Sequence, residues 1–582
     1  MKKIGLSILF LIGAVMTVAQ TVPPRPNSIL LVVPEKDTVE TPTSTYRLSA
    51  STAPDSKVFV NGKSYKVYPS GAFCGKLTLA VGANPFIITS SDPSGAIVSR
   101  SFLINRSKPM EATPTDTLRI EDTMMQPYQD MWVKEGDILE VQFKGTPGGK
   151  ASFMNGIPMK ERQGKGIAGI YRGTYKVKSS DTLLSQPIVF KLQVRDSSVT
   201  KSTAARVSFK SHQLPIVAIT KGERPYLNAG LGEDRLGGFK FSIMNPGIRL
   251  RITGKVSNMY RVELAESHIV WIEDIYVDLQ PEETFLPKSL TGDMTVSPEE
   301  KMDVVSLSLN DKLPYASVQE MNPSRIVVDV FGATSNTNWI TQQLTTKEIK
   351  NVYYEQVESD VFRLTIELKH KQIWGYEIAY EGNTLKVRVR RQPEKLKLKA
   401  LTFAIDAGHG GENHGAVGST GVYEKEITLA VVRHLAAILE NEGARVILTR
   451  PDDTNIRMTD RFMHAYTGGA DMLISVHANS IGLTTDPALT KGSGTFYKHI
   501  AFRPLSQFIL QQVLKTGLDT LGNVGSFNFS LNGPTEFPTA LVETAFISNP
   551  EDEMKLMDDD FRKALAKRIV NGIEDFLDYC DE

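Results

Sequence analysis

Hydrophobic and polar positions follow two different patterns along this chain, and the pattern changes near residue 400. From residue 27 to about 395, short runs of alternating apolar and polar residues recur with turn residues between them, which is typical of β-strands. After residue 400, apolar runs of strand length alternate with longer stretches of helical periodicity. The pattern predicts a multidomain protein, with β-rich N-terminal modules (sandwiches or small barrels) followed by a C-terminal α/β domain.

Two β modules are expected at the front of the chain. Residues 27–106 contain short strands separated by turns such as Asn61-Gly62 and Gly82-Ala83-Asn84, and they resemble the Ig-like sandwiches found beside bacterial surface enzymes. Residues 107–212 contain strand-turn units such as "GIYRGTYKV" and are expected to form a second β module, which we assign to no family.

Each of the next two modules resembles a known wall-associated domain. Residues 214–283 combine short strands with Tyr260 and Trp271 and resemble a bacterial SH3-like barrel. Such barrels often bind cell-wall peptides, but the favoured interpretation of these two aromatic residues is that they belong to the core. Residues 300–392, with "SRIVVDVFGA" and "VFRLTIEL", are similar to the AMIN domain that precedes many secreted amidases.

A basic segment joins these modules to the last domain. Residues 386–399 contain seven Lys/Arg and one Glu, and residues 393–400 are expected to form a linker. One hypothesis is that the basic segment helps to hold an anionic polymer. The favoured alternative is a solvated edge strand followed by a linker.

The N-terminus has the pattern of a secretory signal peptide, which we assign to residues 1–19. Lys2 and Lys3 precede an apolar run of 16 residues, which is short for a membrane span of about 20 residues. Thr17-Val18-Ala19 places small residues before a cleavage point. An uncleaved anchor is the alternative. We therefore expect an exported protein of the periplasm or cell envelope, with no transmembrane segment after cleavage.

Charge is divided unequally between the two parts of the chain. The 582 residues include 66 Lys+Arg and 66 Asp+Glu, but residues 401–582 hold 15 of the former and 25 of the latter, a net charge of −10. Residues 1–400 therefore carry +10. The neutral total argues against a nucleic-acid partner, whereas a basic front part suits the carboxylates of peptidoglycan. Cys74 and Cys580 are expected to be unpaired rather than bridged.

The α/β domain is expected to begin directly after the linker. The predicted strands cover 401–408, 445–450, 471–479, 494–499 and 539–548, and the predicted helices cover 424–442, 457–467, 503–520 and 560–579. In such sheets, ligands bind beyond the carboxyl ends of the strands.

Two histidines and a glutamate are the candidate metal ligands. His409 in "DAGHGG" and His477 in "SVHAN" lie at the ends of predicted strands. Glu424 opens a predicted helix on the same face as Ile427, where a buried carboxylate needs either the helix dipole or a metal as its partner. Two His and one Glu, with a fourth position left for water, are a catalytic zinc set.

Other polar residues of this domain are candidates for supporting roles. Glu543 lies within the apolar run "TALVETAFIS", where a free carboxylate is costly unless it is paired or lies beside a metal. His414 and His499 are candidates to line the cleft, although a structural role is favoured for both. Asp406 and Asn479 are candidates to orient the ligand histidines.

Residues 401–579 resemble the zinc-dependent N-acetylmuramoyl-L-alanine amidases of the Amidase_3 family. The motifs that carry the resemblance occur in family order: "DAGHGG", "GAVGSTGVYEKEITL", "ILTRPDD" with Arg461 beyond, "ADMLISVHAN" and "PTALVETAFISNPED". Ala407 and Ala545 stand where the family commonly has Pro and Gly, and neither position is a predicted ligand. Some relatives carry an inhibitory helix after the second histidine motif, but residues 480–493 leave little room for one.

The resemblance implies a zinc amidase domain over residues 401–580, with one zinc ion held by His409, Glu424 and His477 and with Glu543 as the catalytic glutamate. The implied reaction cleaves the bond between N-acetylmuramic acid and L-alanine of the stem peptide, in wall remodelling or daughter-cell separation. The implied partners are peptidoglycan and a division-associated or wall-associated activator. The alternatives are a peptidase that acts within the stem peptide and a wall-binding protein whose catalytic site has decayed.

Overall fold

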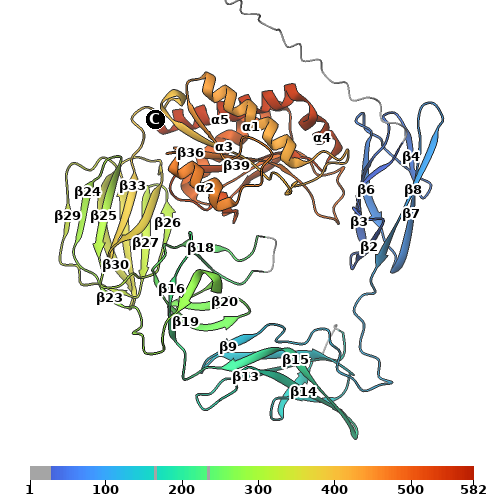
Figure 1. Ribbon diagram of the computed structural model, residues 1–582, viewed down its shortest axis with the longest axis horizontal. Helices are drawn as coiled ribbons and strands as arrows, with labels where there is room; N and C mark the ends of the chain where they lie inside the picture. Colours follow the sequence, from blue (N-terminus) through green and yellow to red (C-terminus); the bar gives the residue numbers. More distant parts are fainter. Residues whose placement is uncertain (1–27, 163–166, 233–235) are drawn as a thin grey trace, which may run out of the picture.

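The computed structural model describes residues 28–162, 167–232 and 236–582. The predicted signal peptide lies outside these residues. Within them, no helix has both the length and the apolar composition that a membrane crossing requires. The β-rich front part and the C-terminal α/β domain are confirmed, and the modules follow one another around a ring that brings the first of them back to the last domain (Figure 1).

The first module, residues 28–106, is a β-sandwich, called the N-terminal sandwich below. Its two sheets are ordered β1-β3-β6 and β2-β8-β7-β4-β5, and apolar residues of both sheets, such as Leu48 and Ile88, form its core. The strands are β1 (Leu30–Val33), β2 (Thr38–Thr41), β3 (Thr45–Ser51), β4 (Lys57–Val60), β5 (Lys63–Tyr65), β6 (Ala72–Thr78), β7 (Gly82–Ser91) and β8 (Ile97–Arg106).

The second and third modules share one continuous sheet. β9 pairs in parallel with β15 of the second module and antiparallel with β19 of the third. The second module contains β9 (Met131–Val133), β10 (Ile138–Lys144), β11 (Lys150–Phe153), β12 (Ile157–Glu161), β13 (Ile170–Lys176), β14 (Gln186–Val194) and β15 (Ser197–Phe209). The third contains β16 (Ile216–Thr220), β17 (Tyr226–Asn228), β18 (Lys240–Ile243), β19 (Arg249–Val256), β20 (Met259–Ala265), β21 (His268–Glu273), η1 (Asp274–Tyr276) and β22 (Val277–Leu279).

The third module also shares its hydrophobic core with the module that follows. One cluster of buried residues joins Ile252 and Val262 to Val305 and Ile366, and it includes Tyr260. The following module contains β23 (Ser289–Leu290), β24 (Met294–Pro298), β25 (Met302–Ser308), β26 (Tyr315–Glu320), β27 (Arg325–Phe331), β28 (Ala333–Thr334), β29 (Ile340–Gln342), β30 (Ile349–Glu358), β31 (Val361–Leu368), β32 (Tyr376–Glu381) and β33 (Thr384–Arg390).

The basic residues of β33 are engaged in ion pairs. Lys386 and Arg388 both bind Glu381, and Arg390 Nη1 lies 3.1 Å from Asp471 Oδ1. β33 lies between β25 and β32, so the prediction of an edge strand is wrong. Because these cations already have carboxylate partners, less free positive charge is available for an anionic polymer than the sequence indicates.

The C-terminal domain is built on a six-stranded sheet in the order β35-β34-β36-β39-β37-β38. β34, β35, β36 and β39 are parallel, and β37 runs antiparallel to β39. The elements are η2 (Leu398–Ala400), β34 (Thr402–Ala407), α1 (Glu424–Asn441), β35 (Arg445–Leu448), α2 (Met458–Thr467), β36 (Met472–Asn479), β37 (Ser493–Phe496), η3 (Ile500–Phe502), α3 (Arg503–Val513), η4 (Leu514–Thr516), β38 (Thr520–Val524), η5 (Ser530–Asn532), β39 (Thr539–Phe546), α4 (Pro550–Met557) and α5 (Asp559–Asp581).

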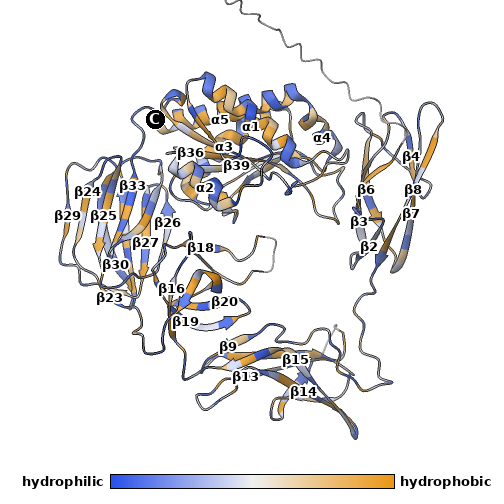
Figure 2. Ribbon diagram, in the orientation of Figure 1, coloured by the Kyte–Doolittle hydropathy of each residue, from blue (hydrophilic) through white to orange (hydrophobic). Residues whose placement is uncertain are grey.

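The helices of this domain are amphipathic and pack on the sheet. Ile427, Val431 and Leu435 of α1 are buried in the same cluster as Ile569 of α5, and both helices carry hydrophobic and hydrophilic residues (Figure 2). α1 ends just before Gly443, whose φ of 83° supplies the left-handed conformation typical of a helix C-terminus. Cys74 and Cys580 are free and buried, as expected.

Candidate metal centre

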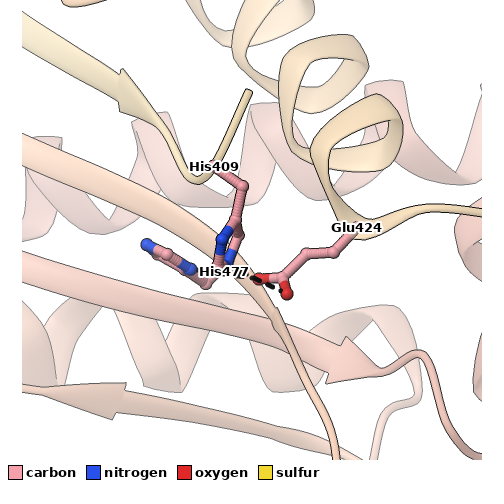
Figure 3. Close-up of side chains that lie close together, drawn as sticks. All are labelled: His409, Glu424 and His477. Atoms are coloured by element: carbon pink, nitrogen blue, oxygen red, sulfur yellow. Dashed lines mark hydrogen bonds and ion pairs between the residues drawn. The ribbon is translucent and has the colours of Figure 1, made fainter. Parts of the chain in front are cut away.

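His409, Glu424 and His477 converge at the carboxyl end of the central strands (Figure 3). His409 follows β34, His477 lies in the neighbouring strand β36, and Glu424 is the first residue of α1. One ligand atom from each residue lies within 4.8 Å of the other two. Glu424 Oε2 is 3.1 Å from His409 Nε2, and Glu424 Oε1 is 3.0 Å from His477 Nδ1.

The backbone around His409 is shaped to bring the two imidazoles together. His409 has a φ of 62°, in the left-handed region that a non-glycine residue rarely adopts. The preceding Gly408 has no room for a side chain, because a Cβ there would lie 2.5 Å from His477 Cε1. The two imidazole rings lie edge to face, with their centroids 5.1 Å apart.

The charge on Glu424 is stabilised by the two histidines. Burial alone raises the pKa of this carboxyl, but the hydrogen bonds with His409 and His477 outweigh it and hold the pKa far below its usual range. For His477, burial lowers the pKa, but the hydrogen bond with Glu424 and the nearby charge of Glu543 more than compensate and raise it. The centre is therefore a hydrogen-bonded cluster around an ionised carboxylate.

The donor set of this cluster fits a zinc ion. His477 Nε2 is buried and has no hydrogen-bond partner among the described residues. A buried ring nitrogen requires a partner, and a metal cation that accepts the lone pair of the nitrogen is one such partner. Two imidazoles and one carboxylate are ligands that catalytic zinc takes in proteins, with a further position left for water.

Glu543 lies next to the cluster, on β39. The parallel register of β36 and β39 pairs Glu543 with His477, and paired residues on adjacent strands point to the same face of a sheet. Its side chain is half-buried. The four residues singled out from the sequence are therefore brought to one place.

A residue not singled out from the sequence orients His409. Asn413 Oδ1 lies 3.0 Å from His409 Nδ1, which leaves the other ring nitrogen facing Glu424. A carbonyl oxygen behind a ligand histidine fixes the orientation and tautomer of the ring. The only signal in the sequence was an Asn four positions after the histidine, within a glycine-rich loop.

The predicted roles of Asp406 and Asn479 are wrong. Asp406 accepts hydrogen bonds from Thr449 Oγ1, Ser475 Oγ and Arg461 Nη1, and no hydrogen bond joins it to either imidazole. Its connection to the centre is indirect, because Arg461 Nη2 donates to the backbone oxygen of His409. Asn479 instead accepts a hydrogen bond from the backbone nitrogen of Ser480.

Replacing Arg461 by methionine is expected to destabilise the C-terminal domain. The side chains of Arg461 and Asp406 are 0% and 1% exposed, so removing the cation leaves a buried carboxylate uncompensated, at a cost of about 3–5 kcal/mol. The matched control is Arg457→Met, since Arg457 is 74% exposed and pairs with Asp460 on the surface; its loss should cost less than about 1 kcal/mol. Hydrogen exchange of β34 and β36 amides in a urea series measures both, and equal effects would contradict the prediction.

His499 lies away from the centre, in a cavity of about 480 Å³ at the junction of three modules. Arg224 of the third module, Glu377 of the fourth and Glu536 of the C-terminal domain also line this cavity. The hypothesis that His499 lines the metal-centre cleft is therefore wrong. His414 stacks on Tyr423 with ring centroids 4.2 Å apart.

Acid is expected to loosen this junction through His499. Burial lowers the pKa of His499 to about 4, so the folded chain keeps the ring neutral while the unfolded chain binds a proton below pH 6.5 or so. The stabilisation is complete above that pH and is lost as the pH falls toward 4. Because the ring is only half-buried, we expect a loss of about 1–2 kcal/mol. Urea unfolding of the His499→Gln variant should lack this pH dependence; an unchanged profile would contradict the prediction.

Comparisons with known proteins identify two families in this chain. The Amidase_3 family, described as N-acetylmuramoyl-L-alanine amidase, matches residues 403–575, and the AMIN domain matches residues 293–389. Similar proteins include "Uncharacterized protein YqiI" of Bacillus subtilis (strain 168), 34% identical over 31% of this chain and 87% of YqiI. The N-acetylmuramoyl-L-alanine amidase AmiC of Escherichia coli O6:H1 is 25% identical over 47% of this chain and 86% of AmiC.

Two further relatives match the C-terminal domain. "Probable cell wall amidase LytH" of Staphylococcus aureus is 32% identical over 31% of this chain and 60% of LytH, so the match spans less than two thirds of that protein. Among solved structures, the catalytic domain of CwlV, an N-acetylmuramoyl-L-alanine amidase of Bacillus (Paenibacillus) polymyxa var. colistinus, is 34% identical, with a TM-score of 0.29, over 31% of this chain and 98% of CwlV.

The C-terminal domain is thus the hydrolase part of a cell-wall amidase. The chain belongs to the N-acetylmuramoyl-L-alanine amidase family, and it carries an AMIN module in front of its catalytic domain.

Proposed function

We propose that this chain is an exported, zinc-dependent enzyme that cleaves the amide bond between N-acetylmuramic acid and L-alanine of the peptidoglycan stem peptide. The observation that carries the proposal is the convergence of His409, Glu424 and His477 within 4.8 Å, with Glu543 on the adjacent strand. The family of the chain supports cell-wall hydrolysis in general. The zinc ion, the scissile bond and the residue roles are the finer parts of the proposal.

His409, Glu424 and His477 would hold the zinc ion. When bound, zinc supplies Lewis acidity and lowers the pKa of its water toward about 7. Ligands must be deprotonated, and the low pKa of Glu424 satisfies that condition at neutral pH. Asn413 keeps the His409 ring turned toward the centre.

Glu543 acts as the general base and acid in this proposal. Its carboxylate accepts a proton from the attacking water, and the resulting carboxylic acid returns that proton to the amine of L-alanine as the amide bond breaks. Proton transfer is therefore balanced within one side chain. Phe529, whose ring lies edge-on to His477 with centroids 5.5 Å apart, forms an apolar wall of the same site.

Digestion of purified peptidoglycan with the zinc-loaded protein tests this function. Mass spectrometry should detect stem peptides with a free L-alanine amine and glycan strands without peptide. Fragments cut within the stem would instead indicate a peptidase, and an absence of soluble products would indicate a binding protein.

The cellular setting belongs to the same proposal. Residues 1–19 would direct export to the periplasm or cell envelope, and the enzyme would serve wall remodelling or daughter-cell separation with a division-associated or wall-associated activator. N-terminal sequencing of the protein from the envelope fraction should find Gln20 first; retention of Met1 would contradict cleavage.

A further inference from the structure

Strand β3 of the N-terminal sandwich is buried on both of its faces. In a sandwich, every second residue of a strand faces the core and the others face solvent. Leu48 and Ala50 face the core and are 0% exposed, but Arg47, Ser49 and Ser51 between and beside them are only 6%, 1% and 3% exposed. The outer face of this strand is therefore covered, and Figure 1 shows the sandwich beside the C-terminal domain.

A loop of the C-terminal domain contacts the sandwich at Arg47. The backbone nitrogen of Arg47 donates to the backbone oxygen of Leu483 over 2.6 Å. Its side-chain Nη1 donates to the oxygen of Ile481 over 2.8 Å and to Ser480 Oγ over 3.3 Å. Thr45 Oγ1 adds a longer bond of 3.4 Å to the backbone oxygen of Thr484.

The loop lies where the sheet of the sandwich has an incomplete edge. β1 pairs with β3 only from Ser49 to Ser51, and it ends before Pro34. The part of β3 around Arg47 is thus left without a strand on that side. An open strand edge leaves backbone groups free to bond with another segment, and here the backbone nitrogen of Arg47 bonds with the turn at Leu483.

The same loop begins directly after β36, the strand that carries His477. Residues 480–492 leave the carboxyl end of β36, three positions after His477, and contain no helix. His477 itself lies in a strand that is paired on both sides, with β34 and β39. Because ligands bind beyond the carboxyl ends of the strands in such sheets, release of the loop would change the rim of the site and leave His477 in place.

We propose that the N-terminal sandwich is an intramolecular clasp, in which β3 holds residues 480–484 and thereby sets the rim that binds the substrate. The occupant of the open edge is this loop of the same chain. The effect on substrate rests on the proposed function, whereas the docking itself does not. The clasp links a module more than 400 residues away in sequence to the substrate side of the catalytic domain.

Arg47→Ala in the full-length chain tests the clasp. We expect faster hydrogen exchange at residues 481–484 and a KM for soluble peptidoglycan fragments that rises about fivefold, because a released rim is in its binding conformation for a smaller fraction of the time. The kcat and the zinc content should not change. Arg100→Ala is the matched control, since Arg100 lies on β8 of the other sheet and pairs with Asp37 of the same module.

Two outcomes would overturn the proposal or its effect on substrate. Unchanged exchange at residues 481–484 would overturn the docking, and faster exchange with an unchanged KM would overturn the effect on substrate. Protection of β7 and β8 shows whether the sandwich is still folded. If Arg47→Ala unfolds it, Arg47→Lys decides in its place, because lysine keeps the buried stem and the charge but not the fork that reaches both Ile481 and Ser480. If the wild type cleaves no peptidoglycan, the proposed function fails while the exchange result still decides the docking.

Discussion

Replacing His477 by alanine is expected to remove the bound zinc and the hydrolysis of peptidoglycan together. His477 Nδ1 faces Glu424, and the buried Nε2 has no hydrogen-bond partner among the described residues. Without this imidazole, the centre keeps one histidine and one carboxylate, too few ligands for a catalytic zinc site. We expect activity to fall by more than about 100-fold, the upper range found when only an outer partner of a metal ligand is lost.

Elemental analysis of the purified variant, together with its rate of peptidoglycan digestion, measures both effects. The matched control is His414→Ala, because His414 stacks on Tyr423 and is not one of the three converging residues. It should retain about one zinc per chain, as a single tetrahedral site holds. A His477→Ala protein that keeps its zinc would show that the metal ligands are assigned wrongly.

Replacing Glu543 by glutamine is expected to lower turnover strongly while leaving zinc bound. Glutamine has nearly the same shape but cannot take a proton from water, and the loss of a general acid–base group lowers kcat by about 10²–10⁴-fold. Glu543 is not one of the three converging ligands, so the zinc content should stay that of the wild type. This separation of binding from turnover distinguishes a base from a ligand.

The control for Glu543→Gln is Glu426→Gln, in the first turn of α1. This change removes the carboxylate of Glu426, which lies close in sequence to Glu424 but has no role in the proposed chemistry. Full activity of Glu543→Gln would refute the proposed proton transfer, and loss of zinc from it would make Glu543 a ligand. The pH profile of kcat/KM adds a second test. Its acidic limb reports protonation of the general base, so this limb should be absent from the profile of Glu543→Gln.

Local patterns were enough to predict much of the C-terminal domain. The helix predicted over 424–442 is observed as Glu424–Asn441, because its apolar stripe and the glycine after it are both local signals. The helix predicted over 503–520 is shorter, Arg503–Val513, since Gly517 adopts a φ of 80° and the chain turns into β38. No helix was predicted between the strand at 539–548 and the helix at 560–579, but α4 begins there, and the Asn549 side chain caps it by accepting hydrogen bonds from the backbone nitrogens of Glu551 and Asp552.

The sequence by itself determined most of the order of strands and helices in the C-terminal domain, but not β38 and α4. It also determined the family motifs and the residue types able to hold a metal, because these depend on neighbours within a few positions. Only the tertiary structure decided which distant groups meet. In the tertiary structure, β9 joins the second and third modules. Asp406 pairs with Arg461 and not with a histidine, and Arg47 bonds with Ile481. These contacts depend on how sheets and modules pack. The hydrophobic periodicity of a strand or helix shows which residues share a face, but it does not show which other module covers that face.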